Sequence, residues 1–239
     1  MSAARPRRRR RRRGGCLGFG LVLLVVLLVA ADFGARAFAE NDAASQIQQQ
    51  GFPKKPSVTF GGFPFLTQVI AHNFHQIRIN ASDIPEGPVQ ISQVSAVLNN
   101  VHLSGNFSSG TIGQLSGSVL VTFPALSNAL DSALGPAGAL VGSAGLTLSQ
   151  AGPDEVRASI NLVVTSGSAT WRVTQLSDGK VQINLVGSSG VPASLLQPVS
   201  NYTFSLPKLP YGLKINSVSV TPDGVVGSFS GSNVPFSQS

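Results

Sequence analysis

The chain has 239 residues, of which 42% are hydrophobic and only 11% are charged, and its formal net charge is +7. Arg5 and the run 7–13 supply eight of the 17 basic residues, while the other nine face ten acidic residues, so the chain from Gly14 onward carries about −1. No aromatic residue is interleaved with the arginines. This distribution excludes a basic nucleic-acid-binding domain and assigns the positive charge to an N-terminal cap.

An uncharged apolar segment follows the arginines, from Gly14 to Ala31, and Asp32 ends it. As a helix it would be about 27 Å long, close to the ~30 Å hydrocarbon core of a bilayer. The arginines should stay on the cytoplasmic side. We therefore expect an Arg-rich cytoplasmic cap at 1–15, a transmembrane or signal-anchor helix at 16–31, and an extracytoplasmic domain at 32–239.

The sequence leaves the fate of this segment open. Two small-x-small sequences, ending at Ala37 and Ala39, would permit cleavage by signal peptidase and release of a secreted or periplasmic protein. The apolar run is longer than the usual signal core of about 7–15 residues. Apolar residues at helical spacing also continue the pattern through Asp32–Gln50. Both observations favour an uncleaved anchor with the domain outside the cell membrane.

The remaining chain alternates mainly with period two. Helical spacing follows Pro64, at Leu66, Val69, Ile70 and Phe74, and it recurs at 126–134; a short helix is possible at 193–199. Strands are predicted at 76–81, 89–103, 117–121, 156–164, 171–173, 181–185, 212–220 and 225–229, with hairpin turns at 177–180 and 221–224. These elements predict an antiparallel α+β domain. Alternation alone does not distinguish a lipid-sized cavity from an ordinary core.

Groups suited to catalysis or metal binding are sparse. Cys16, the single cysteine, lies in or beside the membrane, so the exported part has neither a disulfide nor a thiol nucleophile. His72 and His75 would share a helix face, but the nearest acids lie beyond a predicted strand. The sequence 177–180 matches Ser-x-x-Lys only in form, as a hairpin turn, and Gly-x-Ser-x-Gly is absent. We expect no catalytic residues, no metal site and no cofactor.

Two segments are distinctive. The first is Gly-Gly-Phe-Pro-Phe-Leu-Thr-Gln-Val-Ile at 61–70, and the second is Leu-Pro-Lys-Leu-Pro-Tyr-Gly-Leu-Lys-Ile at 206–215. With the N-terminal anchor and an Ala-rich helix ending in Gln, they make residues 32–236 similar to the LmeA family of actinobacterial cell-envelope phospholipid-binding proteins. The resemblance implies a tubular lipid-binding domain, in which a long curved antiparallel sheet wraps around a few helices. It also implies an elongated apolar groove, and a role in lipid or lipoglycan assembly.

The two segments supply the candidate lipid-contacting residues: Phe63, Phe65, Leu66, Ile70, Leu206, Leu209 and Tyr211. Two other interpretations stay open. The first segment would also serve as a core plug that joins a helix to the sheet. The second, held extended by Pro207 and Pro210, would also serve as a linker into the last hairpin.

The function expected from these observations is non-catalytic phospholipid binding in the bacterial cell envelope. The partners are then phospholipid and membrane, and no nucleic acid. One alternative is an envelope scaffold that uses the same sheet to bind protein without a lipid ligand. The other is a hydrolase of lipid or glycan, which requires Ser, His and an acid to converge.

Overall fold

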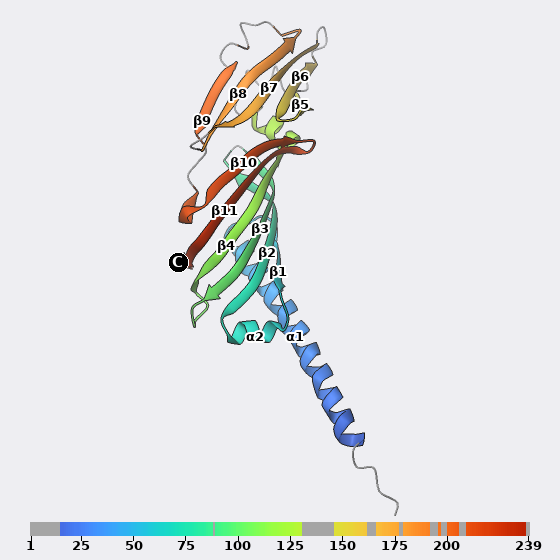
Figure 1. Ribbon diagram of the computed structural model, residues 1–239. Helices are drawn as coiled ribbons and strands as arrows, with labels where there is room; N and C mark the ends of the chain where they lie inside the picture. The colour runs from blue at the N-terminus through green and yellow to red at the C-terminus, as the bar shows by residue number, and fades with distance from the viewer. Residues whose placement is uncertain are drawn as a thin grey trace, which may run out of the picture.

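The computed structural model describes residues 15–87, 89–130, 146–161, 166–176, 179–191, 196, 200–205 and 209–237. In this part of the chain a long helix, α1 (Gly15–Gln49), precedes eleven strands that form two antiparallel sheets (Figure 1). The predicted α+β class with antiparallel strands and few helices is confirmed. The described strands divide between two sheets, whereas the family resemblance implied one long curved sheet.

The first sheet has the order β1-β2-β3-β4-β11-β10. Its strands are β1 (Ser57–Gly61), β2 (Asn73–Glu86), β3 (Val89–Leu103), β4 (Ser109–Thr122), β10 (Lys214–Thr221) and β11 (Gly224–Ser237). The second sheet follows the chain order, with β5 (Thr147–Gly152), β6 (Glu155–Asn161), β7 (Ser166–Leu176), β8 (Lys180–Ser189) and β9 (Asn201–Ser205). The insertion of β5–β9 between β4 and β10 therefore separates strands that share the first sheet.

Helix α1 has an exposed apolar half and a half that packs on the first sheet. Residues 21–28 are exposed and apolar, and among the described residues α1 is the one helix long and apolar enough to cross a membrane. Ala35 and Ala39 contact the core, Ala44 is buried, and Glu40 Oε1 accepts a hydrogen bond of 2.9 Å from the Phe60 backbone N–H on β1. The predicted continuation of the helix beyond Asp32 is confirmed, ending at Gln49.

The second helix, α2 (Phe65–Ile70), is shorter than the pattern predicted. Backbone bonds from Ala71 N to Thr67 O and from His72 N to Val69 O end it, and His72 turns the chain with φ +51°. Phe74 lies in β2, where it packs in the core. The chain is helical again at 123–130; the rest of the predicted 126–134 helix and nearly all of 193–199 lie outside the described residues.

The core lies between the first sheet, α2 and the packed half of α1. Four paired residues on neighbouring strands, which we call the core row, are each 6% exposed or less: Phe74, Val101, Ile112 and Val234. Phe65 joins them from α2, and its ring centroid is 5.3 Å from that of Phe60 and 6.0 Å from that of Phe74. Because side chains alternate along each strand, the opposite face of this sheet carries mainly Ser, Asn and Gln side chains.

Glutamine side chains of the second sheet cover the edge of the first. Gln175 donates to Asn216 O at 3.2 Å and accepts from Val218 N at 2.9 Å, while Gln150 donates to Val220 O at 2.9 Å. These contacts satisfy backbone groups on the free side of β10, which has β11 as its strand partner. The edge is thereby protected from pairing with other chains.

Candidate functional site

A strip of half-buried apolar side chains crosses the first sheet beyond the core row. Two rows of paired residues from β2 to β10 face the same side of the sheet as the core. The half-buried apolar residues of these two rows form what we call the apolar strip: Ile79, Val94, Ala96, Val119, Ile215, Val218 and Phe229. Five adjacent strands span about 19 Å. That length accommodates an acyl chain, since one leaflet contributes about 15 Å of hydrocarbon.

Open space lies over Gly227, which is paired with Val119 and Val218 at the strip. A Cβ built on Gly227 would have no atom within 4 Å. The other glycines on this face of β4 and β11 are covered, because Gly110 lies beneath the Phe236 ring, Gly117 beneath the Phe229 ring and Gly231 beneath Leu213 and Val234. We call this open space, which has Val119 and Val218 on either side, the hollow at Gly227.

The first sequence motif divides between the core and the surface. Phe65 is 3% exposed and belongs to the core, as the core-plug interpretation expected of this segment. Phe63, Leu66 and Ile70 are exposed. The Phe63 ring stacks on Phe33 of α1, with centroids 6.1 Å apart and the planes inclined at 28°.

The second motif lies elsewhere. Tyr211 is exposed with φ +58° in the short 3-10 helix η3 (Pro210–Gly212), which Figure 1 shows beside β10 and β11, away from α2. Leu209 is half-buried, and Leu206 lies outside the described residues. The exposed candidates of the first motif and Tyr211 therefore do not form one site, although Leu213 of the second motif packs against the core cluster that contains Phe65.

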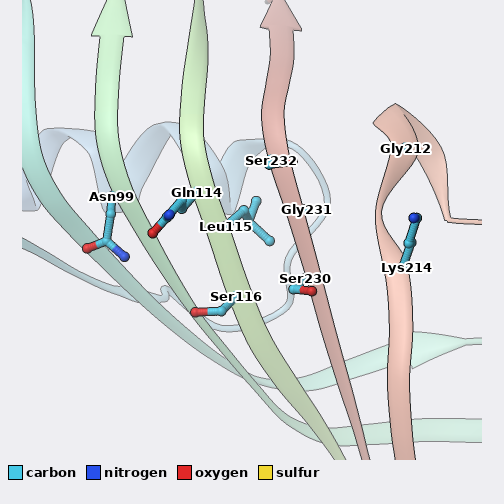
Figure 2. Close-up of a pocket in the computed structure, with 9 residues that line it drawn as sticks. All are labelled: Asn99, Gln114, Leu115, Ser116, Gly212, Lys214, Ser230, Gly231 and Ser232. Atoms are coloured by element: carbon cyan, nitrogen blue, oxygen red, sulfur yellow. The ribbon is translucent and has the colours of Figure 1, made fainter.

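The opposite, polar face of the first sheet carries a cavity of about 470 Å³ (Figure 2). Its lining residues are Asn99, Gln114, Leu115, Ser116, Gly212, Lys214, Ser230, Gly231 and Ser232. Paired strands place six of these polar side chains on one face, and the core lies on the other. Hydroxyl and amide walls do not suit an acyl chain, because burying polar groups without partners is costly.

His72 and His75 do not share a helix face, because α2 ends at Ile70 before either residue. The His72 ring lies against Phe107, with centroids 4.6 Å apart, and His75 is exposed on β2 rather than sharing a helix face with His72. Among the described residues there is no cluster of three or more His, Cys, Asp or Glu suited to a metal ion.

The sequence identified the strands of the strip but not their role. A half-buried apolar face follows the same alternation as a core face, so the sequence pattern does not distinguish the strip from the core. Gly227 offered one indirect signal, because a glycine inside a strand removes a side chain from the packing.

The described chain combines a helix that is long and apolar enough to cross a membrane with a sheet whose apolar face is partly open. The chain belongs to the LmeA-like phospholipid-binding family, whose sequence profile matches residues 30–230. This finding confirms the resemblance suggested by the two motifs.

Similar chains occur in mycobacteria. Uncharacterized proteins of Mycobacterium bovis and Mycobacterium tuberculosis are 26% identical over 218 residues. The aligned region covers 88% of this chain and 62% of each relative, so the chain spans less than two thirds of their length. No solved structure matches the chain significantly.

Proposed function

We propose that this protein binds a phospholipid at the outer face of the bacterial cell membrane without catalysing a reaction, and that an acyl chain lies on the apolar strip. The hollow at Gly227 is the observation that carries the proposal. Membership of a phospholipid-binding family supports the class of ligand. Held beside a bilayer, such a protein would present lipid during envelope lipid or lipoglycan assembly.

The strip suits an acyl chain because its walls lack charge and hydrogen-bonding side chains. Val119 and Val218 are half-buried beside Gly227, and half-buried Val94 continues the row on β3, so covering them with hydrocarbon removes apolar surface from water. Each buried methylene contributes about 0.8 kcal/mol, so the affinity should rise with the number of methylenes that lie on the strip.

Helix α1 serves as a lasting anchor in this proposal. Cleavage after Ala37 or Ala39 would cut α1 within its packed half and remove Asp32 and Ala35 from the domain. We therefore expect intact-mass measurement of the membrane-extracted protein to find residues 15–39 still attached. A mature chain that begins at Phe38 or Glu40 would contradict the anchor.

Filling the hollow tests the lipid site. Gly227→Leu should place an apolar side chain where the acyl chain lies, without a clash, because the space over Gly227 is open. Gly187→Leu is the matched control. Its Cβ also meets nothing within 4 Å, but it pairs with Thr170 on the polar face of the second sheet.

Native mass spectrometry and lipid extraction of the full chain give the readout. We expect Gly227→Leu to lose most of the co-purifying phospholipid, and Gly187→Leu to retain it, with both variants melting near the parent temperature. Equal lipid content in the two variants would reject the strip as the site. A parent protein without lipid, which also takes up none from vesicles, would favour the scaffold alternative.

A further inference from the structure

We propose that an apolar rim beside α1 inserts into the outer leaflet of the bilayer that α1 spans. The rim consists of the exposed residues Phe33, Phe63, Leu66, Ile70 and Phe107. The inference rests on the proposed anchor, but it concerns a separate surface from the apolar strip. Its partner is the interfacial layer of a phospholipid bilayer.

The rim exposes large apolar side chains to an unusual extent. Ile70 is 77% exposed, Phe63 59% and Phe33 57%. Their neighbours Phe65 and Phe74 are almost fully buried in the core. The exposure of Phe63 and Ile70 is therefore not shared by every apolar side chain of this short segment. Clustered exposed apolar residues mark an interaction surface.

The position of the rim identifies its partner. Phe33 follows the apolar run of α1 by two residues, and its ring stacks on Phe63. Figure 1 shows α2 and the turn between β3 and β4, which contains Phe107, at the end of the first sheet from which the apolar half of α1 projects. A bilayer that surrounds this half of α1 therefore meets the rim first.

The length of the apolar run supports insertion. Residues 15–31 of α1 provide about 26 Å of apolar helix, slightly less than the ~30 Å hydrocarbon core. A span shorter than the hydrocarbon core draws its flanking residues toward the bilayer. Apolar faces of interfacial segments lie about 5–10 Å into the headgroup and acyl boundary. Phe33 and Phe63 are the flanking residues available to occupy that depth.

Hydrogen bonds join the rim to the apolar half of α1. Asp32 is 4% exposed, and its carboxylate accepts the Phe65 N–H at 2.9 Å and the Leu66 N–H at 2.7 Å. These bonds join α1, at the last turn of its apolar half, to the first turn of α2. Since α1 is one continuous helix, the rim keeps a fixed orientation to the membrane.

Tryptophan quenching in vesicles tests the inference. In the full chain carrying Trp171→Phe, single tryptophans replace Phe63, Ile70 or Phe107 at the rim. Leu23→Trp reports the bilayer centre, and Val186→Trp on β8, also exposed, reports the second sheet. The probes are phosphatidylcholine–phosphatidylglycerol vesicles with phospholipids brominated near the headgroup or near the chain end.

We expect the rim tryptophans to lose emission to lipids brominated near the headgroup, Leu23→Trp to lose it to lipids brominated at the chain end, and Val186→Trp to lose none. Quenching at residue 23 but not at the rim would overturn the rim alone and leave lipid loading by the strip intact. No quenching at residue 23 would overturn anchor and rim together. If Trp171→Phe misfolds, the same positions are changed to Cys in a Cys16→Ser chain and labelled with a polarity-sensitive dye, with the same outcomes deciding.

Discussion

The two ends of the first sheet use the same strands and the same alternation but bury their apolar faces differently. At the α2 end, the core row is covered by α2 and the packed half of α1. Five to seven residues further along these strands, the apolar strip is half-buried, and the space over Gly227 is open.

The difference shows that the covering element, rather than the strand sequence, decides whether an apolar face is buried or half-buried. Val101 and Val94 are both valines of β3, yet Val101 is 1% exposed and Val94 is half-buried. Three rings, Phe60, Phe65 and Phe74, fill the space at the closed end. At the other end, the space over Gly227 is open.

Removing one ring from each end should give the largest and most direct contrast. Phe74→Ala leaves a cavity among Phe60, Phe65 and Val101 and should lower the free energy of unfolding by about 3–5 kcal/mol. Phe229→Ala removes a half-buried ring and should lower it by only about 1–2 kcal/mol, while reducing bound phospholipid. Urea unfolding in detergent, with lipid extraction, measures both. Equal losses of stability would contradict the division of the sheet.

The link between α1 and α2 should have an intermediate effect. Asp32→Ala leaves the Phe65 and Leu66 N–H groups without their acceptor and should lower the free energy of unfolding by about 1–3 kcal/mol. Asp42→Ala, on the same helix, breaks only an exposed bond to Gln46 and should change it by no more than about 0.5 kcal/mol. Thermal melting of the two variants decides. Similar melting temperatures would show that Asp32 does not hold the closed end together.

Local patterns predicted the elements better than their assembly. The strand at 89–103 and the turn at 221–224 depend on alternation and turn residues close in sequence, and both are confirmed. Phe74 was assigned to a helix because it is four residues from Ile70, but its packing on Val101 places it in β2. Helical spacing depends only on residues close in sequence, so it does not predict the contact of Phe74 with Val101.

The candidate site shows the same limit. Asp32 ended the apolar run in the sequence, and its bonds to α2 join residues 33 and 34 positions apart. Gln175 fastens the second sheet to β10 across 41 and 43 positions, so the separation into two sheets was not predicted. The open space at Gly227 depends on which side chains reach it from other strands, and alternation does not specify that.

The smallest effect is expected where a salt bridge ties the loop before β1 to β2, away from both apolar surfaces. Lys54 Nζ lies 2.6 Å from Asp83 Oδ2, and this hydrogen bond holds the pKa of the Asp83 carboxyl below its usual value. A lowered carboxylate pKa stabilises the fold above the unfolded pKa of about 3.9, and the contribution is lost as the pH falls through the lower folded value. Both groups are exposed, so salt should screen the pair and the loss should be slight.

Lys54→Met should therefore remove a small part of the acid-induced fall in melting temperature, and the difference from the parent should vanish in high salt. Lys55→Met is the matched control, because Lys55 bonds to the neutral amide of Asn41, which does not titrate. Melting curves between neutral pH and about pH 3, below the unfolded pKa of Asp, measure the effect. An acid-dependent change as large for Lys55→Met would show that net charge, rather than the Lys54–Asp83 pair, sets the pH response of this loop.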